Sequence, residues 1–489
     1  MRVVSVSTPK LTVDKEAVSV YPALRRKKPK IGFLGLAFFE YWRMYGDQLK
    51  QKVERNHRTI VEDLNKNGNL EIVNPGLIDT LEKAVDAAQL FKREEIDLLV
   101  VWEGTYAPDY YTVQLLDFLP NVPLFILQLQ EMRTIPLDIK YADIVATYGL
   151  IGIVQLLGDF SKIGKKYGLA VGAIGEKEAY KELEDYATAV TTVNRLRWIN
   201  IGVIGRVFRG MYELEWDKTK IKWRLGPNIF YIEIREFLDL FREVTDSEAN
   251  ELMEDLTKRY RVEETTKEEV LKACRYAVAI RRLVEKFRLD ATSHLCQWYL
   301  HSQTETTPCI GCSRLNEIGI MTTCEGDVGQ LIVMCILGML TGKPPFYGEW
   351  ALYDLEENTI LIQHHGLGNP QLAVSPDDIR ITSHIENWGY SGLGAAFEFI
   401  GKPGRVTMCS VIDDVEGIKM LITGGESVKT PARPVHTAHF IVKTDRPVRE
   451  FLQVLLKSGV PHHVVLVHGD ARKQLECVAD LMGIRKLVI

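Results

Sequence analysis

Short apolar runs alternate with amphipathic stretches through the first part of the chain. Runs rich in Val, Ile, Leu and Phe begin at Ile31, Leu70, Ile96 and Val122. Between them, residues 47–68 and 77–95 carry apolar side chains at helical spacing. Continuous apolar strands that alternate with helices are typical of a parallel, doubly wound sheet. The pattern predicts an N-terminal α/β domain over residues 31–175, after a polar lead-in of residues 1–30.

A second unit of the same kind begins near Glu176. The run "RWINIGVIGRVF" has the pattern of another opening strand, and "KEEVLKACRYAVAIRRLVEKF" is strongly helical. We expect a central α/β domain over residues 176–342, again with a doubly wound sheet of the flavodoxin or Rossmann type. No G-x-G-x-x-G motif follows the first strand of the chain, so no nucleotide cofactor is expected.

The pattern changes from Lys343 onward. Short β-like runs such as "TILIQHH", "GRVTMCSVI" and "HHVVLVH" are separated by Gly, Pro and Asp. Many short strands with turn residues between them are typical of a barrel or sandwich. The sequence therefore predicts a β-rich, barrel-like C-terminal domain over residues 343–489.

Composition narrows the class of protein. The chain has 489 residues, of which 46% are hydrophobic and 26% charged, with a net charge of −5. These values are typical of a soluble globular protein with several domains. No basic block is present to bind nucleic acid. Residues 1–20 lack a signal-peptide core, and the apolar run at 331–340 is too short to span a bilayer, so we expect a cytoplasmic protein without membrane contact.

One cysteine spacing allows a zinc site. "CIGC" places Cys309 and Cys312 at ligand spacing, with Cys324 further along the chain. A structural zinc site takes four ligands, usually two close pairs, and no second cysteine pair exists. Cys296 or His301 could complete a set. Scattered buried thiols in a reduced compartment are the favoured interpretation.

The histidines are unevenly distributed. Ten of the eleven follow residue 293, and the exception is His57. Two adjacent pairs, His364–His365 and His462–His463, are each joined to a β-like run. Because successive strand residues face opposite ways, each pair is expected to send one imidazole into a shared pocket. Imidazole is the commonest metal ligand in proteins, which makes a metal site a hypothesis to weigh.

Two acids complete this hypothesis. Glu325 lies at the expected start of an apolar helix, whose dipole would keep the carboxylate ionised. Glu349, in "FYGEWALYD", lies in or beside a strand. Two carboxylates and two imidazoles suit Mn²⁺, Co²⁺ or Mg²⁺ better than structural zinc. The alternative is that both acids are ordinary solvated residues and that the histidines are satisfied by backbone groups.

Together these segments resemble the L-arabinose/L-fucose isomerase family, over residues 31–470. "CEGD" resembles the family's Glu-Gly-Asp element, whose glutamate binds metal and acts as an acid/base, here Glu325. "FYGEWALYD" resembles the strand that carries the second glutamate, here Glu349. "QHHGLGNP" and "GVPHHVVLVHGD" resemble the family's two histidine elements, which select His364 and His463 as metal ligands.

The resemblance also implies a set of residues that contact the substrate. These are Tyr41, Gln128, His384, Trp388 and His462. The first domain would supply a largely neutral wall that includes Phe38 and Trp102. Phe38 stands where the family has a glutamine, and Gln128 stands where it has a histidine, so the resemblance leaves the identity of the sugar open.

The resemblance implies that the protein is an aldose–ketose isomerase that acts on an arabinose- or fucose-type sugar. A divalent ion, first of all Mn²⁺, would bridge O1 and O2 of the sugar, and Glu325 and Glu349 would move protons through a cis-enediol. A metal-dependent hydrolase with the same ligands and a non-catalytic sugar-binding protein are the alternatives. The family builds its sites where subunits meet, which implies a homo-oligomer, a hexamer or trimer.

Overall fold

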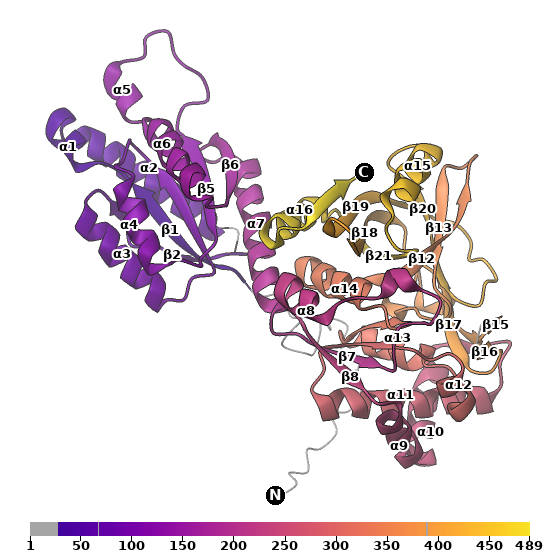
Figure 1. The fold of residues 1–489 in the computed structure, drawn as a ribbon. Coiled ribbons are helices and arrows are strands. Elements are labelled where there is room, and N and C mark those ends of the chain that lie inside the picture. The colour runs from indigo at the N-terminus through magenta and orange to yellow at the C-terminus, as the bar shows by residue number, and fades with distance from the viewer. Residues whose placement is uncertain (1–27, 67, 388–389) are drawn as a thin grey trace, which may run out of the picture. The chain divides into compact units, whose positions relative to one another are not determined.

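The computed structural model describes residues 28–66, 68–387 and 390–489. Two compact units form within it, one from residues up to Asn194 and one from Arg195 to Ile489 (Figure 1). The expected polar lead-in lies outside the described residues except for its last three positions. The division into three domains remains a prediction beside these two units.

The first unit contains a six-stranded sheet in which every pairing is parallel. The strands are β1 (Lys30–Leu36), β2 (Glu71–Val73), β3 (Leu77–Ile78), β4 (Leu98–Glu103), β5 (Leu124–Gln130) and β6 (Tyr167–Ala173), in the order β2-β1-β4-β5-β6, with β3 also paired to β1. The helices are α1 (Phe39–Tyr45), α2 (Asp47–Lys66), α3 (Leu81–Arg93), α4 (Tyr110–Phe118), α5 (Tyr141–Val145), α6 (Gly149–Ile163) and α7 (Lys177–Leu196). The α/β fold with a parallel sheet is thus confirmed.

Alternate residues of the strands pack into opposite layers. Leu34 belongs to one core cluster with residues of α3, α4 and α6. On the other face, the ring of Phe33 lies 5.5 Å from that of His57 in α2. Burial lowers the pKa of His57 to about 4, so this imidazole is neutral. The one histidine of the early chain is therefore a core residue.

Strand β6 lies at the edge of the sheet and was not expected from the sequence. Leu169 and Val171 are 47% and 68% exposed, so the strand has no buried apolar face of the usual kind. Its pattern is correspondingly weak. An edge strand that is half exposed loses the continuous apolar run by which central parallel strands are recognised.

One stretch of the described residues, Tyr141–Ile163, is long and apolar enough to cross a membrane by length and composition. It contains α5 and α6, and 39% of its most apolar window is buried. Ile153, Leu156 and Phe160 of α6 belong to the core cluster of the first unit. Part of the apolar surface of this stretch is therefore packed in the core of the first unit.

The second unit contains a four-stranded parallel sheet in the order β11-β10-β7-β8. Its strands are β7 (Asn200–Ile204), β8 (Asn228–Ile232), β10 (Ala291–His294) and β11 (Met321–Cys324). The accompanying helices are α8 (Lys218–Lys220), α9 (Ile234–Glu243), α10 (Asp246–Arg259), α11 (Lys267–Phe287), α12 (Tyr299–Thr304) and α13 (Cys309–Glu317). This second parallel sheet agrees with the expected central α/β pattern.

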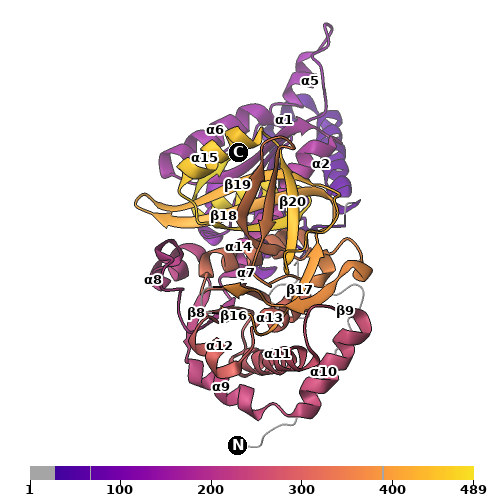
Figure 2. The ribbon, with the colours of Figure 1, turned by 90° about the vertical axis from the view of Figure 1, so that its right-hand side faces the viewer.

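The same unit contains a ten-stranded, mostly antiparallel sheet (Figure 2). Its order is β22-β19-β18-β21-β12-β13-β20-β17-β14-β9, and β19 also pairs with β20, which closes a ring. The strands are β9 (Arg261–Val262), β12 (Phe346–Asp354), β13 (Thr359–Gln363), β14 (Arg380–Ser383), β17 (Ala395–Ile400), β18 (Gly404–Asp414), β19 (Gly417–Ser427), β20 (Ala438–Thr444), β21 (His463–His468) and β22 (Arg485–Val488). Helices α15 (Val448–Ser458) and α16 (Arg472–Met482) and a small hairpin, β15 (Glu386–Asn387) and β16 (Tyr390–Ser391), complete the fold. The β-rich C-terminal part is confirmed, and barrel closure remains a prediction.

Helix α14 (Val328–Thr341) joins the two sheets of the second unit (Figures 1 and 2). Every residue from Val328 to Leu340 is buried, as expected for a helix that is apolar on all sides. It contacts β10 and β11 of the parallel sheet, and β12, β18 and β21 of the ten-stranded sheet. Its N-terminal end therefore lies where residues from both sheets can meet.

Candidate active site

Four predicted ligands meet at the N-terminal end of α14. Nε2 of His463 lies 3.2 Å from Oε2 of Glu325. Nε2 of His364 lies 3.9 Å from the same oxygen and 3.9 Å from Oε1 of Glu349. Segments far apart in the sequence are thus brought into one cluster, the metal cluster, defined as Glu325, Glu349, His364 and His463.

Strand pairing explains three of these positions. Glu349 lies on β12, directly opposite His463 on β21 in the antiparallel register. On its other side it faces Gln363 on β13, the residue before His364. Directly opposed residues bring their side chains close together when they share a face of the sheet. The register of β12 with its two neighbours therefore assembles one carboxylate and both imidazoles.

The backbone turns sharply at Glu325, between β11 and α14. Glu325 has φ +63°, and Gly326 follows with φ +76°. A Cβ atom at Gly326 would lie 2.7 Å from the carbonyl oxygen of Arg206, so glycine is required there. Asp327 then caps the helix by accepting from Gln330 N. Glu325 thus lies in the turn before the helix, and its left-handed φ is uncommon for a residue with a side chain.

The donor atoms of the cluster fit a divalent cation. Oε2 of Glu325, Nε2 of His364 and Nε2 of His463 are buried and make no hydrogen bond with the described residues. The ligand atoms of these three residues lie within 4.8 Å of one another. A second group with this spacing contains Glu349, His462 and His463. Buried polar atoms normally have hydrogen-bond partners, so three unpaired atoms that lie close together indicate a position for a ligand.

Further side chains orient the cluster, and they were not among the predicted site residues. Nδ1 of His463 donates to Oδ2 of Asp327 at 2.9 Å and lies 2.8 Å from the Tyr347 hydroxyl. Nε2 of Gln297 donates to Oε1 of Glu325 at 2.8 Å. Asp327 carried a signal, as an acid just before an apolar helix. Gln297 follows β10 and carried none.

Electrostatics couple the charged members. Burial alone would lower the pKa of His463, but its hydrogen bond to Asp327 and the nearby carboxylate of Glu325 raise it to about 10. Burial alone would raise the pKa of Glu325, but the nearby imidazoles of His364 and His463 hold it below its ordinary value. A proton on His463 and a cation would compete for Nε2.

The two histidine pairs differ in geometry. The rings of His364 and His365 are 6.2 Å apart and nearly perpendicular at 87°, and only His364 belongs to a group of potential ligands. The rings of His462 and His463 are 4.0 Å apart. His462 precedes β21, so strand alternation does not govern its direction, and its Nδ1 lies 2.8 Å from Oε1 of Glu213.

The remaining predicted residues lie in different places. His384 is 3% exposed, with its Nε2 buried and unpaired among the described residues. Trp388 lies outside the described residues. Tyr41, on α1, and Gln128, on β5, belong to the first unit, so their contact with a sugar remains a prediction. Trp102, expected on the sugar-facing wall, is only 1% exposed and is a core residue.

The cysteines contribute no metal group among the residues that the structure describes. Cys309 and Cys312 are buried on α13. Sγ of Cys309 instead donates to the carbonyl oxygen of His365 at 3.7 Å. Sγ of Cys296 lies 3.4 Å from Sγ of Cys324. Buried thiols, the favoured interpretation of this spacing, agree with these contacts.

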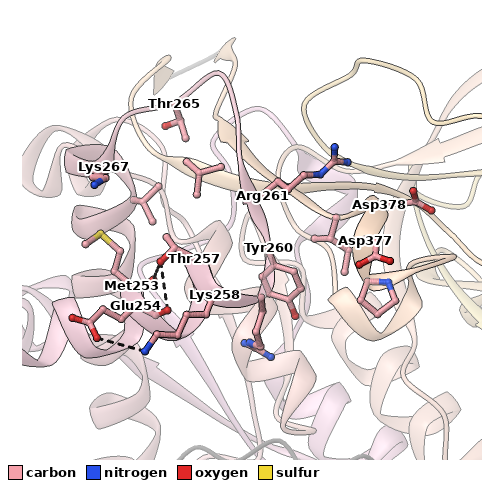
Figure 3. A pocket seen from close by; sticks show the side chains of 15 residues that line it. Met253, Glu254, Thr257, Lys258, Tyr260, Arg261, Thr265, Lys267, Asp377 and Asp378 are labelled. Atoms are coloured by element: carbon pink, nitrogen blue, oxygen red, sulfur yellow. Dashed lines mark hydrogen bonds and ion pairs between the residues drawn. The ribbon is translucent and has the colours of Figure 1, made fainter.

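A cleft of about 1080 Å³ lies elsewhere in the second unit (Figure 3). It is formed by the end of α10, β9 and the start of α11, together with the turn at Pro376. Lys258 and Arg261 line it together with Glu254, Asp377 and other residues. The opposite charges are interspersed, and the lining contains no predicted site residue.

Comparison with known proteins agrees with this geometry. The family models for the L-arabinose isomerase central domain and C-terminal domain match residues 204–342 and 346–485. A sulfoquinovose isomerase from Alkalicoccus urumqiensis is 24% identical over 319 residues, which cover 65% of this chain and 71% of that protein. One from Priestia aryabhattai is 22% identical, covering 82% and 87%. An L-arabinose isomerase from Anoxybacillus flavithermus is 22% identical, covering 92% and 93%.

The two domain matches meet at the metal cluster. The central-domain match contains Glu325, and the C-terminal match contains Glu349, His364 and His463. The relatives extend the similarity over most of the chain. The chain belongs to the L-arabinose isomerase family of aldose–ketose isomerases.

Proposed function

We propose that this isomerase requires one divalent cation, held by Glu325, Glu349, His364 and His463. The convergence of three buried, unpaired donor atoms carries this proposal. Mixed carboxylate and imidazole donors favour Mn²⁺, with Co²⁺ or Mg²⁺ as alternatives. When bound, the ion polarises the sugar carbonyl and acidifies the neighbouring C–H bond.

The two glutamates then serve as the acid/base pair. Aldose–ketose interconversion moves a hydrogen between C2 and C1, so one group removes the C–H proton and another moves the hydroxyl proton through a cis-enediol. Gln297 fixes Oε1 of Glu325, and Gln363 donates to Oε2 of Glu349 at 3.1 Å. Each carboxylate is thereby held in one orientation with its second oxygen facing His364. Held geometry of this kind is what efficient proton transfer requires.

The substrate is a free aldose or ketose with adjacent oxygens at C1 and C2. The family resemblance favours an arabinose- or fucose-type sugar. Relatives are named both L-arabinose isomerase and sulfoquinovose isomerase, so both sugars belong among the substrates to be tried. A pure sugar-binding protein would have no use for two oriented carboxylates, which argues against that alternative.

The proposal is tested by turnover with defined metals. Protein stripped with EDTA and checked by elemental analysis is given Mn²⁺, Co²⁺ or Mg²⁺, and ketose formation is followed for a panel of aldoses. We expect no turnover without metal and the best recovery with Mn²⁺ or Co²⁺. Full turnover by metal-free protein would refute the metal requirement. Ester or amide cleavage without sugar turnover would favour the hydrolase alternative.

A further inference from the structure

The loop that follows β7 contacts Glu325 of the metal cluster and His462, which precedes the cluster residue His463. The backbone N–H of Phe208 donates to the carbonyl oxygen of Glu325 at 2.9 Å. Further along, Oε1 of Glu213 lies 2.8 Å from Nδ1 of His462. The residues between these two contacts are therefore held beside the cluster, and they include Arg209.

Arg209 is held in place by an aromatic surface. Its guanidinium carbon lies 4.0 Å from the ring centroid of Trp298, a cation–π arrangement. The ring of Trp298 also lies 4.9 Å from that of Phe208. Trp298 directly follows Gln297, which donates to Glu325. The loop that carries Arg209 is thus anchored to the backbone carbonyl of Glu325. The neighbour of Trp298, Gln297, is anchored to the carboxylate of the same residue.

The backbone at Trp298 is in an uncommon conformation. Its φ is +54° and its ψ is −95°, a region that bulky side chains rarely adopt. Such conformations cost energy and persist where the surroundings impose them, commonly at functional sites. In this conformation the indole ring contacts both Phe208 and Arg209.

The charge of Arg209 is not neutralised by any residue that the structure describes. Across the described parts of the chain, its guanidinium makes no hydrogen bond or ion pair, and its side chain is exposed. One acid of the same loop, Glu213, is engaged by His462. Stacking on Trp298 fixes the plane of the guanidinium and leaves its edge donors available. That geometry matches the paired oxygens of a sulfonate, phosphate or carboxylate.

We propose that Arg209 binds an anionic group of the substrate, at the end of the sugar remote from C1 and C2. The inference rests on the proposed function, since it assumes that the reacting end of the sugar lies at the metal cluster. It narrows the substrate class from aldoses in general to aldoses that carry a sulfonate, a phosphate or a carboxylate.

The test measures selectivity rather than activity alone. Initial rates are compared for sulfoquinovose, glucose 6-phosphate and glucuronate against the neutral sugars glucose, L-arabinose and L-fucose, with Mn²⁺ present. We expect the highest kcat/KM with one of the three anionic sugars, and the arms of the panel identify which oxyanion is recognised. The variants are Arg209→Gln and Arg209→Lys, with Arg206→Gln as the matched control, an exposed arginine of the same loop without the contact to Trp298.

For Arg209→Gln we expect the ratio of anionic to neutral kcat/KM to fall by about 10- to 100-fold, mainly through KM, because a charge-assisted hydrogen bond is lost. Arg209→Lys should recover part of the ratio, since it keeps the charge without the planar fork. Arg206→Gln should leave the ratio unchanged. Circular dichroism and Mn²⁺ affinity identical to wild type show that the fold and the metal cluster are intact.

Two results would overturn the inference while leaving the proposed function standing. One is that the wild-type enzyme turns over neutral sugars but none of the anionic sugars. The other is an anionic-to-neutral ratio that Arg209→Gln leaves unchanged, or that Arg206→Gln lowers equally. Absence of turnover with every sugar and every metal would instead overturn the proposed function, and the inference with it.

Discussion

Asp327 and His463 are joined by a hydrogen bond of 2.9 Å between two fully buried side chains. The other oxygen of the same carboxylate caps helix α14 by accepting from the N–H of Gln330. One residue therefore both starts the helix and fixes the ring orientation of His463, whose Nε2 then faces Glu325. Carboxylates that hold the far nitrogen of a ligating histidine tune metal affinity in this way.

Replacing Asp327 should weaken metal binding without unfolding the protein. Asn is as good an N-cap as Asp and can still accept from His463, but it lacks the charge. We expect Asp327→Asn to lower Mn²⁺ affinity by about 10- to 100-fold, measured by competition with a chelator. Asp378→Asn, an exposed position in the turn after Pro376, is the control. A Mn²⁺ affinity equal to that of the wild type would show that the charge of Asp327 does not contribute to metal binding.

Loss of either glutamate should greatly reduce turnover. Glu325→Gln and Glu349→Gln keep the size of the side chain but cannot transfer a proton, so kcat should fall by about 10²- to 10⁴-fold. Weaker metal binding would add to this loss, so rates are measured at saturating Mn²⁺. Glu357→Gln, in an exposed turn, is the control. A near-normal rate for either variant would show that its carboxylate is not part of the acid/base pair.

Much of the fold could be predicted because its strands are buried on both faces. β1, β4 and β5 carry continuous apolar runs and were recognised within a few residues. β6 was missed because it is a half-exposed edge strand. A barrel-like arrangement was expected for the C-terminal strands, but their order was not, because pairing between strands distant in sequence, such as β18 and β21, depends on the packing of the whole sheet.

The residues of the metal cluster could be predicted from their type, but the residues that orient them could not. Glu325, Glu349, His364 and His463 belong to side-chain classes that bind metal, and their segments resemble known elements. Gln297 is an ordinary amide in a loop, and only the fold brings it to Glu325. Trp102 was misplaced on the sugar-facing wall because an aromatic residue near the end of a strand has the same pattern whether its ring lies in the core or at the surface.

The adjacent histidines His364 and His365 should differ in their effect on metal affinity. Nε2 of His364 faces both glutamates, whereas the ring of His365 is nearly perpendicular to it. We expect His364→Ala to weaken Mn²⁺ binding strongly and His365→Ala to have a much smaller effect, both measured by calorimetry. The reverse ranking would mean that His365 is the ligand. Similarly, His463→Ala should weaken binding more than His462→Ala.

Stability of the first unit should depend on the protonation of Glu103. Burial raises the pKa of this carboxyl well above its ordinary value. The folded chain then holds a proton that the unfolded chain releases, so the free energy of unfolding falls as pH rises from the ordinary value toward the folded one. Each unit of difference is worth about 1.4 kcal/mol.

Glu103→Gln should remove this dependence. The amide can still accept the hydrogen bond that the Ala107 N–H donates to Oε2 at 3.1 Å. In urea unfolding followed by circular dichroism, the variant should gain stability relative to wild type between pH 4 and pH 8. Glu95→Gln, at an exposed turn, is the control. A constant difference between variant and wild type across this range would contradict a raised pKa at Glu103.

The last prediction concerns assembly and the sugar-facing wall. The family resemblance implies that the first unit of one chain covers the metal cluster of another, in a trimer or hexamer. Light scattering should therefore show a homo-oligomer, and a fully active monomer would refute the shared site. Gln128 on β5 is 6% exposed, and its Oε1 has no hydrogen-bond partner within the described residues, as expected of a group that awaits a substrate hydroxyl.

Gln128→Ala should therefore change the relative kcat/KM of different sugars by more than it changes Mn²⁺ affinity, because the amide lies on the unit that does not contain the metal cluster. Gln130→Ala is the matched control on the same strand, since its amide already donates to the carbonyl oxygen of Met132 at 2.6 Å. A sugar profile that Gln128→Ala leaves unchanged would exclude this amide from the wall. A loss of metal affinity instead would mean that Gln128 supports the metal cluster. That result would contradict the prediction that the first unit contacts the sugar and only the second unit binds the metal.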